Sequence, residues 1–100
     1  MTGNQSGFKK QSFQWGDKKY HLREAVCFDV KYEKPLWVYD CPRYKIHTFS
    51  YNQHDALNQL DEDFDFLYNG LVEEDDENLT RDAIELKRIL EKDILEVIEV

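Results

Sequence analysis

The spacing of apolar residues changes once along this chain, near residue 52, and that change limits the folds open to it. Before this point apolar side chains alternate with polar ones, as at Val26, Phe28 and Val30, which is the spacing of a strand with one buried face. After it they fall three and four residues apart, as at Leu57 and Leu60, which is typical of an amphipathic helix. We therefore predict an α+β domain, with an antiparallel sheet of three or more strands followed by two helices packed on one face.

Turn-forming residues divide the first half of the chain into strands. The Gly-Asp pair at residues 16–17 predicts a short hairpin between two alternating segments. The segment Glu-Lys-Pro at residues 33–35 predicts a turn into a returning strand at residues 36–39. Residues 40–43 break that strand, and residues 46–51 form the next one.

Two helices are expected in the second half. Asn52 has a side chain suited to capping the first helix, whose apolar stripe runs from Leu57 to Leu71. Thr80 is placed to cap the second helix, and apolar residues continue at helical spacing through Ile98. This stripe is wider than one neighbour needs, which predicts contact with two elements or with a second copy of the chain as a homodimer.

The length and composition indicate one folded domain. The 100 residues include 41% hydrophobic residues, too many for a disordered acidic chain, and residues 1–7 are small and polar. We expect a disordered tail at residues 1–7 and a single domain at residues 8–100. The sequence has no membrane-length apolar run and no signal-peptide pattern, so a cytoplasmic protein with free thiols at Cys27 and Cys41 is expected.

Charge is divided unevenly along the chain. Residues 1–50 carry nine Lys and Arg against five Asp and Glu, a net charge of +4. Residues 51–100 carry four against sixteen, a net charge of −12, and the two sum to −8. Such a chain favours a basic protein partner and repels nucleic-acid phosphates. We predict a partner-binding surface made of seven acidic residues from the first helix and the segment after it: Asp61, Asp65, Glu73, Glu74, Asp75, Asp76 and Glu77.

Trp37 and Tyr39 are further partner-binding candidates. They alternate with Leu36 and Val38 along one strand. If the aliphatic pair faces the helices, the two large rings lie on the helix-free face of the sheet, where exposed aromatic rings mark a partner surface. The alternative is that the N-terminal hairpin folds over these rings and covers them.

No motif for metal or cofactor binding stands out. The spacing of Asp61, Asp63 and Asp65 imitates the start of a calcium loop, but its sixth position is Phe66 and its twelfth is Val72, where such loops need glycine and glutamate. The cysteines and histidines lack the close spacing of zinc ligand pairs, and no glycine-rich oxyanion segment accompanies them. We therefore expect no catalytic residue, metal or cofactor.

Parts of the sequence are compatible with two other activities. Basic residues near aromatic ones in the first half, such as Lys10 and Phe13, allow stacking on single-stranded nucleic acid, but the net negative charge opposes it. Asp29 and Asp40 on adjacent strands could form a degenerate nuclease-like site with a helix carboxylate. Ordinary strand alternation also places two such carboxylates there, so we favour a protein that is not an enzyme.

The stretch of residues 26–68 resembles the HicB-like antitoxins. The shared pattern is an apolar strand, a tight turn, a second strand ending in an acidic-proline segment, a short third strand and a capped helix. Here it is carried by residues 28–32, 37–42, 46–49 and 52–57. Residues 78–100 show no DNA-binding module, so the part of the family function that this resemblance implies is neutralisation of a partner.

The resemblance implies a partial ribonuclease-H-like fold and, as partner, a small basic RNA-cleaving toxin. An acidic surface suits this role because it can occupy a cationic RNA groove and speed association. The alternative is a stand-alone inhibitor or nucleic-acid mimic, for example phage-encoded, or an interaction domain without a toxin partner.

Overall fold

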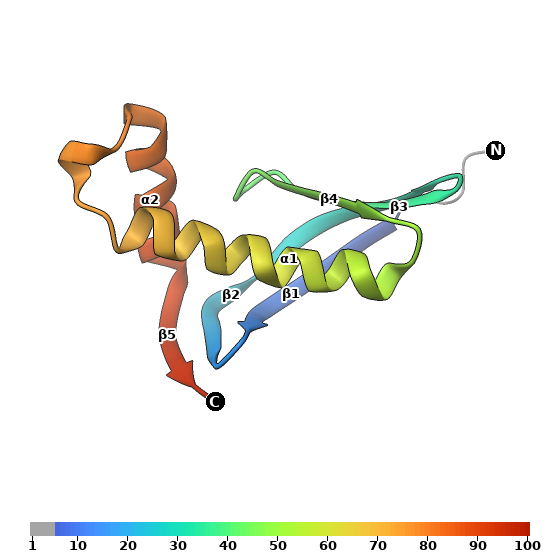
Figure 1. Cartoon of the computed structure of the whole chain (residues 1–100), viewed down its shortest axis with the longest axis horizontal. Coiled ribbons are helices and arrows are strands. Elements are labelled where there is room, and N and C mark those ends of the chain that lie inside the picture. The colour runs from blue at the N-terminus through green and yellow to red at the C-terminus, as the bar shows by residue number, and fades with distance from the viewer. Residues whose placement is uncertain (1–5) are drawn as a thin grey trace.

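A computed structural model describes residues 6–100 and confirms an α+β fold (Figure 1). The expected tail at residues 1–7 lies mostly outside the described residues, but Ser6 and Gly7 already belong to the first strand. Five strands form one antiparallel sheet in the order β1-β2-β3-β4, with β5 also paired to β2. The strands are β1 (Ser6–Trp15), β2 (Lys18–Glu33), β3 (Leu36–Cys41), β4 (Ile46–Ser50) and β5 (Ile94–Glu99).

The long strand β2 organises the sheet. Residues 18–21 and 26–30 of this 16-residue strand pair with β1 along one edge, with a register shift between the two stretches. The two-residue turn between β1 and β2 uses Gly16 at a φ of 62°, which glycine adopts without strain. On the opposite edge, residues 18–22 pair with β5 and residues 29–33 pair with β3. Within residues 6–100, no strand pairs with this edge at residues 23–27, so the sheet has a gap there.

Both predicted helix starts are confirmed. Helix α1 (Gln53–Leu67) begins after Asn52, whose side chain accepts a hydrogen bond of 2.8 Å from the Asp55 N–H. Helix α2 (Arg81–Asp93) begins after Thr80, whose hydroxyl accepts a hydrogen bond of 3.2 Å from the Ala83 N–H. Each cap satisfies a backbone donor that the first helical turn leaves free. Between the helices lie a wider π-helical turn (Tyr68–Val72) and a short 3-10 turn (Asp76–Asn78).

The second helix is shorter than its apolar stripe predicts. It ends at Asp93, and the next residues form β5 instead of further helical turns. Ile94, Val97 and Ile98 are β-branched, which disfavours a helix and favours a strand. In β5, Val97 lies opposite Tyr20 of β2, so pairing with the sheet settles a choice that the apolar spacing leaves open.

The core lies between α1 and one face of the sheet. Phe64 of α1 stacks on Phe13 of β1 with ring centroids 4.1 Å apart, and the edges of Tyr20 and Tyr44 meet the same ring. Full burial of a side chain of this size contributes about 1.5–3 kcal/mol to folding. Figure 1 shows α1 lying along the sheet and α2 standing at the end where β5 begins.

Trp37 and Tyr39 lie on the helix-covered face, so the expectation of a helix-free aromatic surface is wrong. Tyr39 is 3% exposed, and its hydroxyl accepts a hydrogen bond of 3.3 Å from Gln53 of α1. Trp37 packs against the ring of Tyr32 at 5.0 Å and against the core. The alternative, in which the N-terminal hairpin folds over the rings, is also wrong, because β1 is a strand of the same sheet and α1 covers Tyr39. Phe8 of β1 meets the Tyr39 ring with ring centroids 6.2 Å apart. Large rings fill the space beneath α1 better than the smaller aliphatic pair does.

Candidate partner-binding surface

The acidic segment at residues 73–77 is folded around one lysine. Lys87 of α2 is only 9% exposed, and its ammonium group donates hydrogen bonds to the Glu74 carbonyl and to Asp76 Oδ1, at 2.5 Å and 2.8 Å. A buried ammonium group needs such partners because it loses its water. A run of like charges such as residues 73–77 favours a solvated connector, whereas here the segment has a defined conformation against α2.

Two carboxylates of the segment, those of Glu74 and Asp76, accept hydrogen bonds from neighbouring residues of the segment and of α2. Asp76 also accepts a hydrogen bond from Arg88 at 2.9 Å, and its two cationic neighbours hold the pKa of Asp76 below its ordinary value. The Glu74 side chain accepts hydrogen bonds from the Asn78 amide and the Asp75 N–H, which lower the pKa of Glu74. Both side chains therefore stay ionised and shape the segment.

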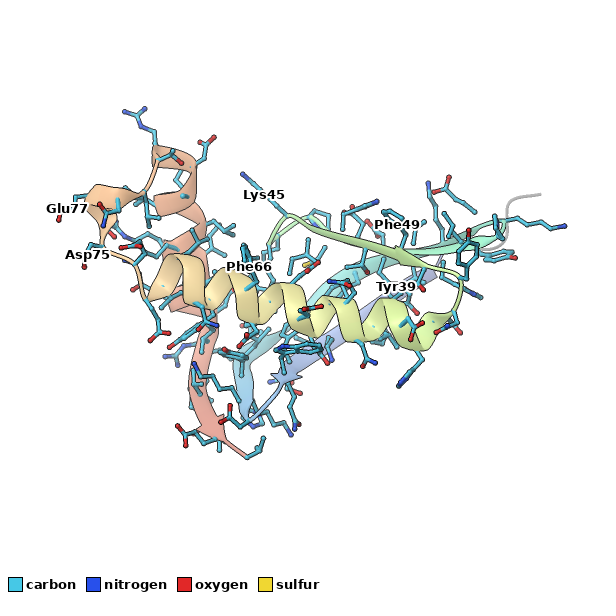
Figure 2. The ribbon with its side chains drawn as sticks, in the orientation of Figure 1. Tyr39, Lys45, Phe49, Phe66, Asp75 and Glu77 are labelled. Atoms are coloured by element: carbon cyan, nitrogen blue, oxygen red, sulfur yellow. The ribbon has the colours of Figure 1, made fainter. Side chains whose placement is uncertain are left out.

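The other three carboxylates of the segment are exposed, and we call them the acidic tip: Glu73, Asp75 and Glu77. Within the described part of the chain, none of the three makes an ion pair. Figure 2 shows Asp75 and Glu77 at one extremity of the molecule, beside α2. Of the acidic residues predicted to bind a partner, these three are exposed and have side chains that make neither an ion pair nor a hydrogen bond within residues 6–100, whereas the Glu74 side chain accepts two hydrogen bonds.

Asp61 and Asp65 instead attach α1 to the sheet. Asp61 lies 3.3 Å from the Lys10 ammonium of β1 and is half-buried, and this burial raises the pKa of its carboxyl group. Its Oδ1 makes no well-directed hydrogen bond, so the contact with Lys10 is chiefly ionic. Asp65 accepts a hydrogen bond of 2.5 Å from the Tyr20 hydroxyl. Burial and this carboxylate raise the pKa of Tyr20 far above its ordinary value.

The helix-free face of the sheet carries the carboxylates considered for a nuclease-like site. Asp29 and Asp40 are directly opposite each other, and His47 Nδ1 lies 3.5 Å from Asp40 Oδ1. A hollow of about 210 Å³ lies beside them. The helices pack on the other face, so a helix carboxylate does not join this pair. Across residues 6–100, no three His, Cys, Asp or Glu side chains are grouped closely enough to hold a metal ion.

Lys87 is the residue of this surface that sequence reasoning missed. A signal was present, because Lys87 lies three residues from both Ile84 and Leu90 and therefore on the apolar side of α2. A lysine at such a position needs an internal partner, and the nearest acidic run along the sequence is residues 73–77.

Comparisons with protein-family models, with curated proteins and with solved structures found no match to this chain. The HicB-like resemblance therefore stays a prediction. None of the helices in the described part of the chain is both long and apolar enough to cross a membrane.

Proposed function

We propose that this protein is a non-enzymatic interaction protein whose acidic tip binds a basic protein partner. The observation that carries the proposal is that residues 73–77 fold around Lys87, which leaves Glu73, Asp75 and Glu77 exposed and without ion partners among residues 6–100. Because the segment is already ordered, less conformational entropy is lost when a partner binds than for a flexible acidic tail.

The charge of the acidic tip supports a basic partner. Three exposed carboxylates on a molecule of net charge −8 attract a cationic surface over a distance and raise the association rate. This attraction is screened by salt, with a Debye length of about 8 Å at physiological ionic strength. Binding through the acidic tip is therefore expected to weaken as salt is added.

The finer proposal is that the partner is a basic RNA-cleaving toxin. It is supported by the HicB-like pattern of residues 26–68 and by the suitability of carboxylates for blocking a cationic RNA groove. A stand-alone inhibitor of a nuclease, acting as a nucleic-acid mimic, is the alternative that uses the same carboxylates.

The test reverses the charge of the acidic tip in the variant E73K/D75K/E77K. The matched control D17K/E33K/E62K reverses three exposed carboxylates elsewhere and makes the same change in net charge. Each tagged protein is used to capture partners from the source cell at low salt. The proposal expects a basic protein that the wild type and the control capture, that the E73K/D75K/E77K variant loses, and that is released by salt. Equal capture by all three proteins would contradict a role for the acidic tip.

The activity of the captured protein and the position of its gene distinguish the finer proposals. RNA cleavage by that protein, suppressed by the wild-type chain, supports neutralisation of an RNA-cleaving partner. A gene for the captured nuclease adjacent to that of this chain supports the antitoxin, and a nuclease gene elsewhere supports the stand-alone inhibitor. A captured protein without nuclease activity would overturn both while leaving the acidic tip as a docking surface.

A further inference from the structure

Strand β4 forms a regular open edge of the sheet. It lies at the end of the strand order, and its five residues pair with β3 one for one, without a register shift. Among residues 6–100, no strand pairs with its other side, and no turn or side chain forms a hydrogen bond to the backbone of residues 46–50. The backbone N–H and C=O groups that point away from β3 are therefore a template for one more strand.

β4 lacks the charged side chains that the other open edges carry. Lys9 and Lys10 lie on β1, and Glu96 and Glu99 lie on β5. Natural sheets use such residues, or proline, to keep further strands away from an edge. β4 has the sequence Ile-His-Thr-Phe-Ser, and its Phe49 side chain is 59% exposed. Among the strands of residues 6–100, β4 is therefore the edge best suited to accept another strand.

The two faces of β4 differ. Thr48 points under α1, where its hydroxyl donates a hydrogen bond of 3.2 Å to the Ala56 carbonyl. His47 and Phe49 are both exposed on the helix-free face, with ring centroids 6.1 Å apart. Figure 2 shows Phe49 on β4, well away from Asp75 and Glu77 of the acidic tip. A strand added at this edge would cover the side of the Phe49 ring that the fold leaves open.

β4 is self-complementary in an antiparallel pair. With Thr48 at a two-fold axis, His47 of each copy lies opposite Phe49 of the other, and Ile46 lies opposite Ser50. Opposing residues are then an even number of positions apart, so the backbone groups that point outward in one copy meet those that point outward in the other. Rings that lie directly opposite each other on one face stabilise such a pair of strands.

The ends of β4 carry opposite charges. The exposed Lys45 comes just before the strand, and the exposed Asp55 lies in the first turn of α1, just after it. Neither makes an ion pair among residues 6–100. Antiparallel pairing of two copies brings the basic end of each strand to the acidic end of the other. This complementarity favours a second copy of the chain over an unrelated strand.

We infer that β4 is a docking surface for β4 of a second copy of this chain, which joins the two sheets into one. The contact of one short strand is smaller than the roughly 1,200 Å² of stable complexes, so the dimer is in equilibrium with the monomer, with a dissociation constant of about 10–100 μM. The acidic tip stays exposed in both copies, so the inference does not depend on the proposed function.

Sedimentation equilibrium of the full chain, from about 10 μM to 1 mM, tests the inference. Each copy has a net charge of −8, so about 0.3 M NaCl is used to screen the repulsion between copies. The expected result is a mass that rises from one chain to two across this range. The outward-pointing amides of residues 46–50 are expected to exchange with solvent more slowly at the highest concentration.

Three variants locate the contact and its register. F49E is expected to weaken the dimer at least tenfold, roughly the effect of losing a central aromatic side chain. L95E is the matched control, because Leu95 is 54% exposed on the edge strand β5 and the change in charge is the same; its dimer is expected to match that of the wild type. H47K/F49E places a lysine of each copy opposite a glutamate of the other and is expected to recover dimerisation. Q14K/F49E, with the same net charge, is expected not to.

Four outcomes would overturn the inference. The first is a single-chain mass at every concentration of the wild type. The second is a dimer whose formation leaves the exchange of the residue 46–50 amides unchanged, a measurement that needs no variant. The third is equal weakening by F49E and L95E. The fourth is equal recovery, or none, in H47K/F49E and Q14K/F49E, which would contradict the pairing of His47 with Phe49.

Discussion

Lys87 shows at the residue scale how one buried charge gives an acidic segment its conformation. Its ammonium group binds the Glu74 carbonyl and Asp76, while Arg88 binds Asp76 from the exposed side. Removing one partner of an ion pair is costly when the other charge is left buried and unpaired, but Asp76 is exposed and keeps its hydrogen bond from Arg88. An apolar side chain in place of Lys87 is therefore expected to leave global stability nearly unchanged. The local effect is different, because the segment loses its attachment to α2.

We therefore predict that Lys87→Met changes the free energy of unfolding by less than about 1 kcal/mol but loosens residues 73–78. The amides of Asn78 and Leu79, which bond to the carbonyls of Asp75 and Asp76, are expected to exchange with solvent about tenfold faster. The measurements are urea unfolding and amide hydrogen exchange.

Arg88→Met is the control for this prediction. Arg88 binds the same carboxylate, but its side chain is 64% exposed, and exposed ion pairs contribute little. In the Arg88→Met variant, the amides of Asn78 and Leu79 are expected to exchange at close to their wild-type rates. If both variants exchange alike, Lys87 does not hold the segment.

At this scale the sequence predicts what depends on near neighbours. The caps at Asn52 and Thr80 bond to backbone groups three residues away, and both were predicted. The partner of Asp61 is Lys10, and that of Asp93 is Arg43, 50 residues away. Such pairs depend on how the elements pack, so the sequence predicts the acidic surface but not which of its carboxylates stay free.

At the element scale, β5 is the part of the fold that the sequence misassigns. Residues 94–98 have apolar side chains at helical spacing, yet they also contain the β-branched residues of a strand. Only the presence of an open edge on β2 decides between the two. The hairpin and the β2–β3–β4 strands were predicted because each turn carries Gly, Asp or Pro beside a clear alternation.

A pair of substitutions tests the strand. Val97 and Ile98 are both 38% exposed, but Val97 lies opposite Tyr20 on the helix side and Ile98 lies opposite Lys19 on the other face. We predict that Val97→Asp lowers the free energy of unfolding by about 1–2 kcal/mol more than Ile98→Asp does. The reason is that the Tyr20 hydroxyl already binds Asp65, whereas Lys19 attracts a new carboxylate.

Urea unfolding of the two variants at low ionic strength provides the measurement. Val97→Asn and Ile98→Asn serve as uncharged controls, and the difference between their unfolding free energies is expected to be smaller. Equal losses for the two aspartate variants would argue against the strand register.

At the scale of the whole molecule, the charge split along the sequence is only partly a split in space. Folding brings Asp61 against Lys10 and Asp93 against Arg43, so acidic residues of the second half neutralise basic residues of the first. The same contacts attach α1 and the α2–β5 region to the sheet. Among residues 6–100, the three carboxylates of the acidic tip make no ion pair, so their negative charge is available to a partner.

The attachment through Asp93 makes stability depend on pH. The hydrogen bonds from Arg43, followed by that from Tyr44, hold the pKa of Asp93 below its ordinary value of 3.8. The folded state therefore binds this proton less tightly than the unfolded state does. The stability that the ionised carboxylate contributes is complete above the unfolded pKa, and it is lost as the pH falls through the folded pKa.

Asp93→Asn removes this charge while keeping an oxygen that can accept from Tyr44. We predict that the free energy of unfolding of the variant is about 1–2 kcal/mol lower than that of the wild type at pH 7. Charged hydrogen bonds stabilise a fold more than neutral ones, and the half-exposed position of Arg43 limits the loss. The difference should persist to about pH 5 and shrink toward zero between about pH 4 and pH 2, where the wild-type carboxyl gains its proton. Urea unfolding of both proteins at each pH measures this difference.

Glu91→Gln is the control. Glu91 is an exposed carboxylate two residues from Asp93 and has no ion partner among residues 6–100, so this variant should show a small difference that does not follow the same pH course. A constant deficit for Asp93→Asn down to pH 2 would mean that shape, and not the charge bound by Arg43, joins the α2–β5 region to the sheet.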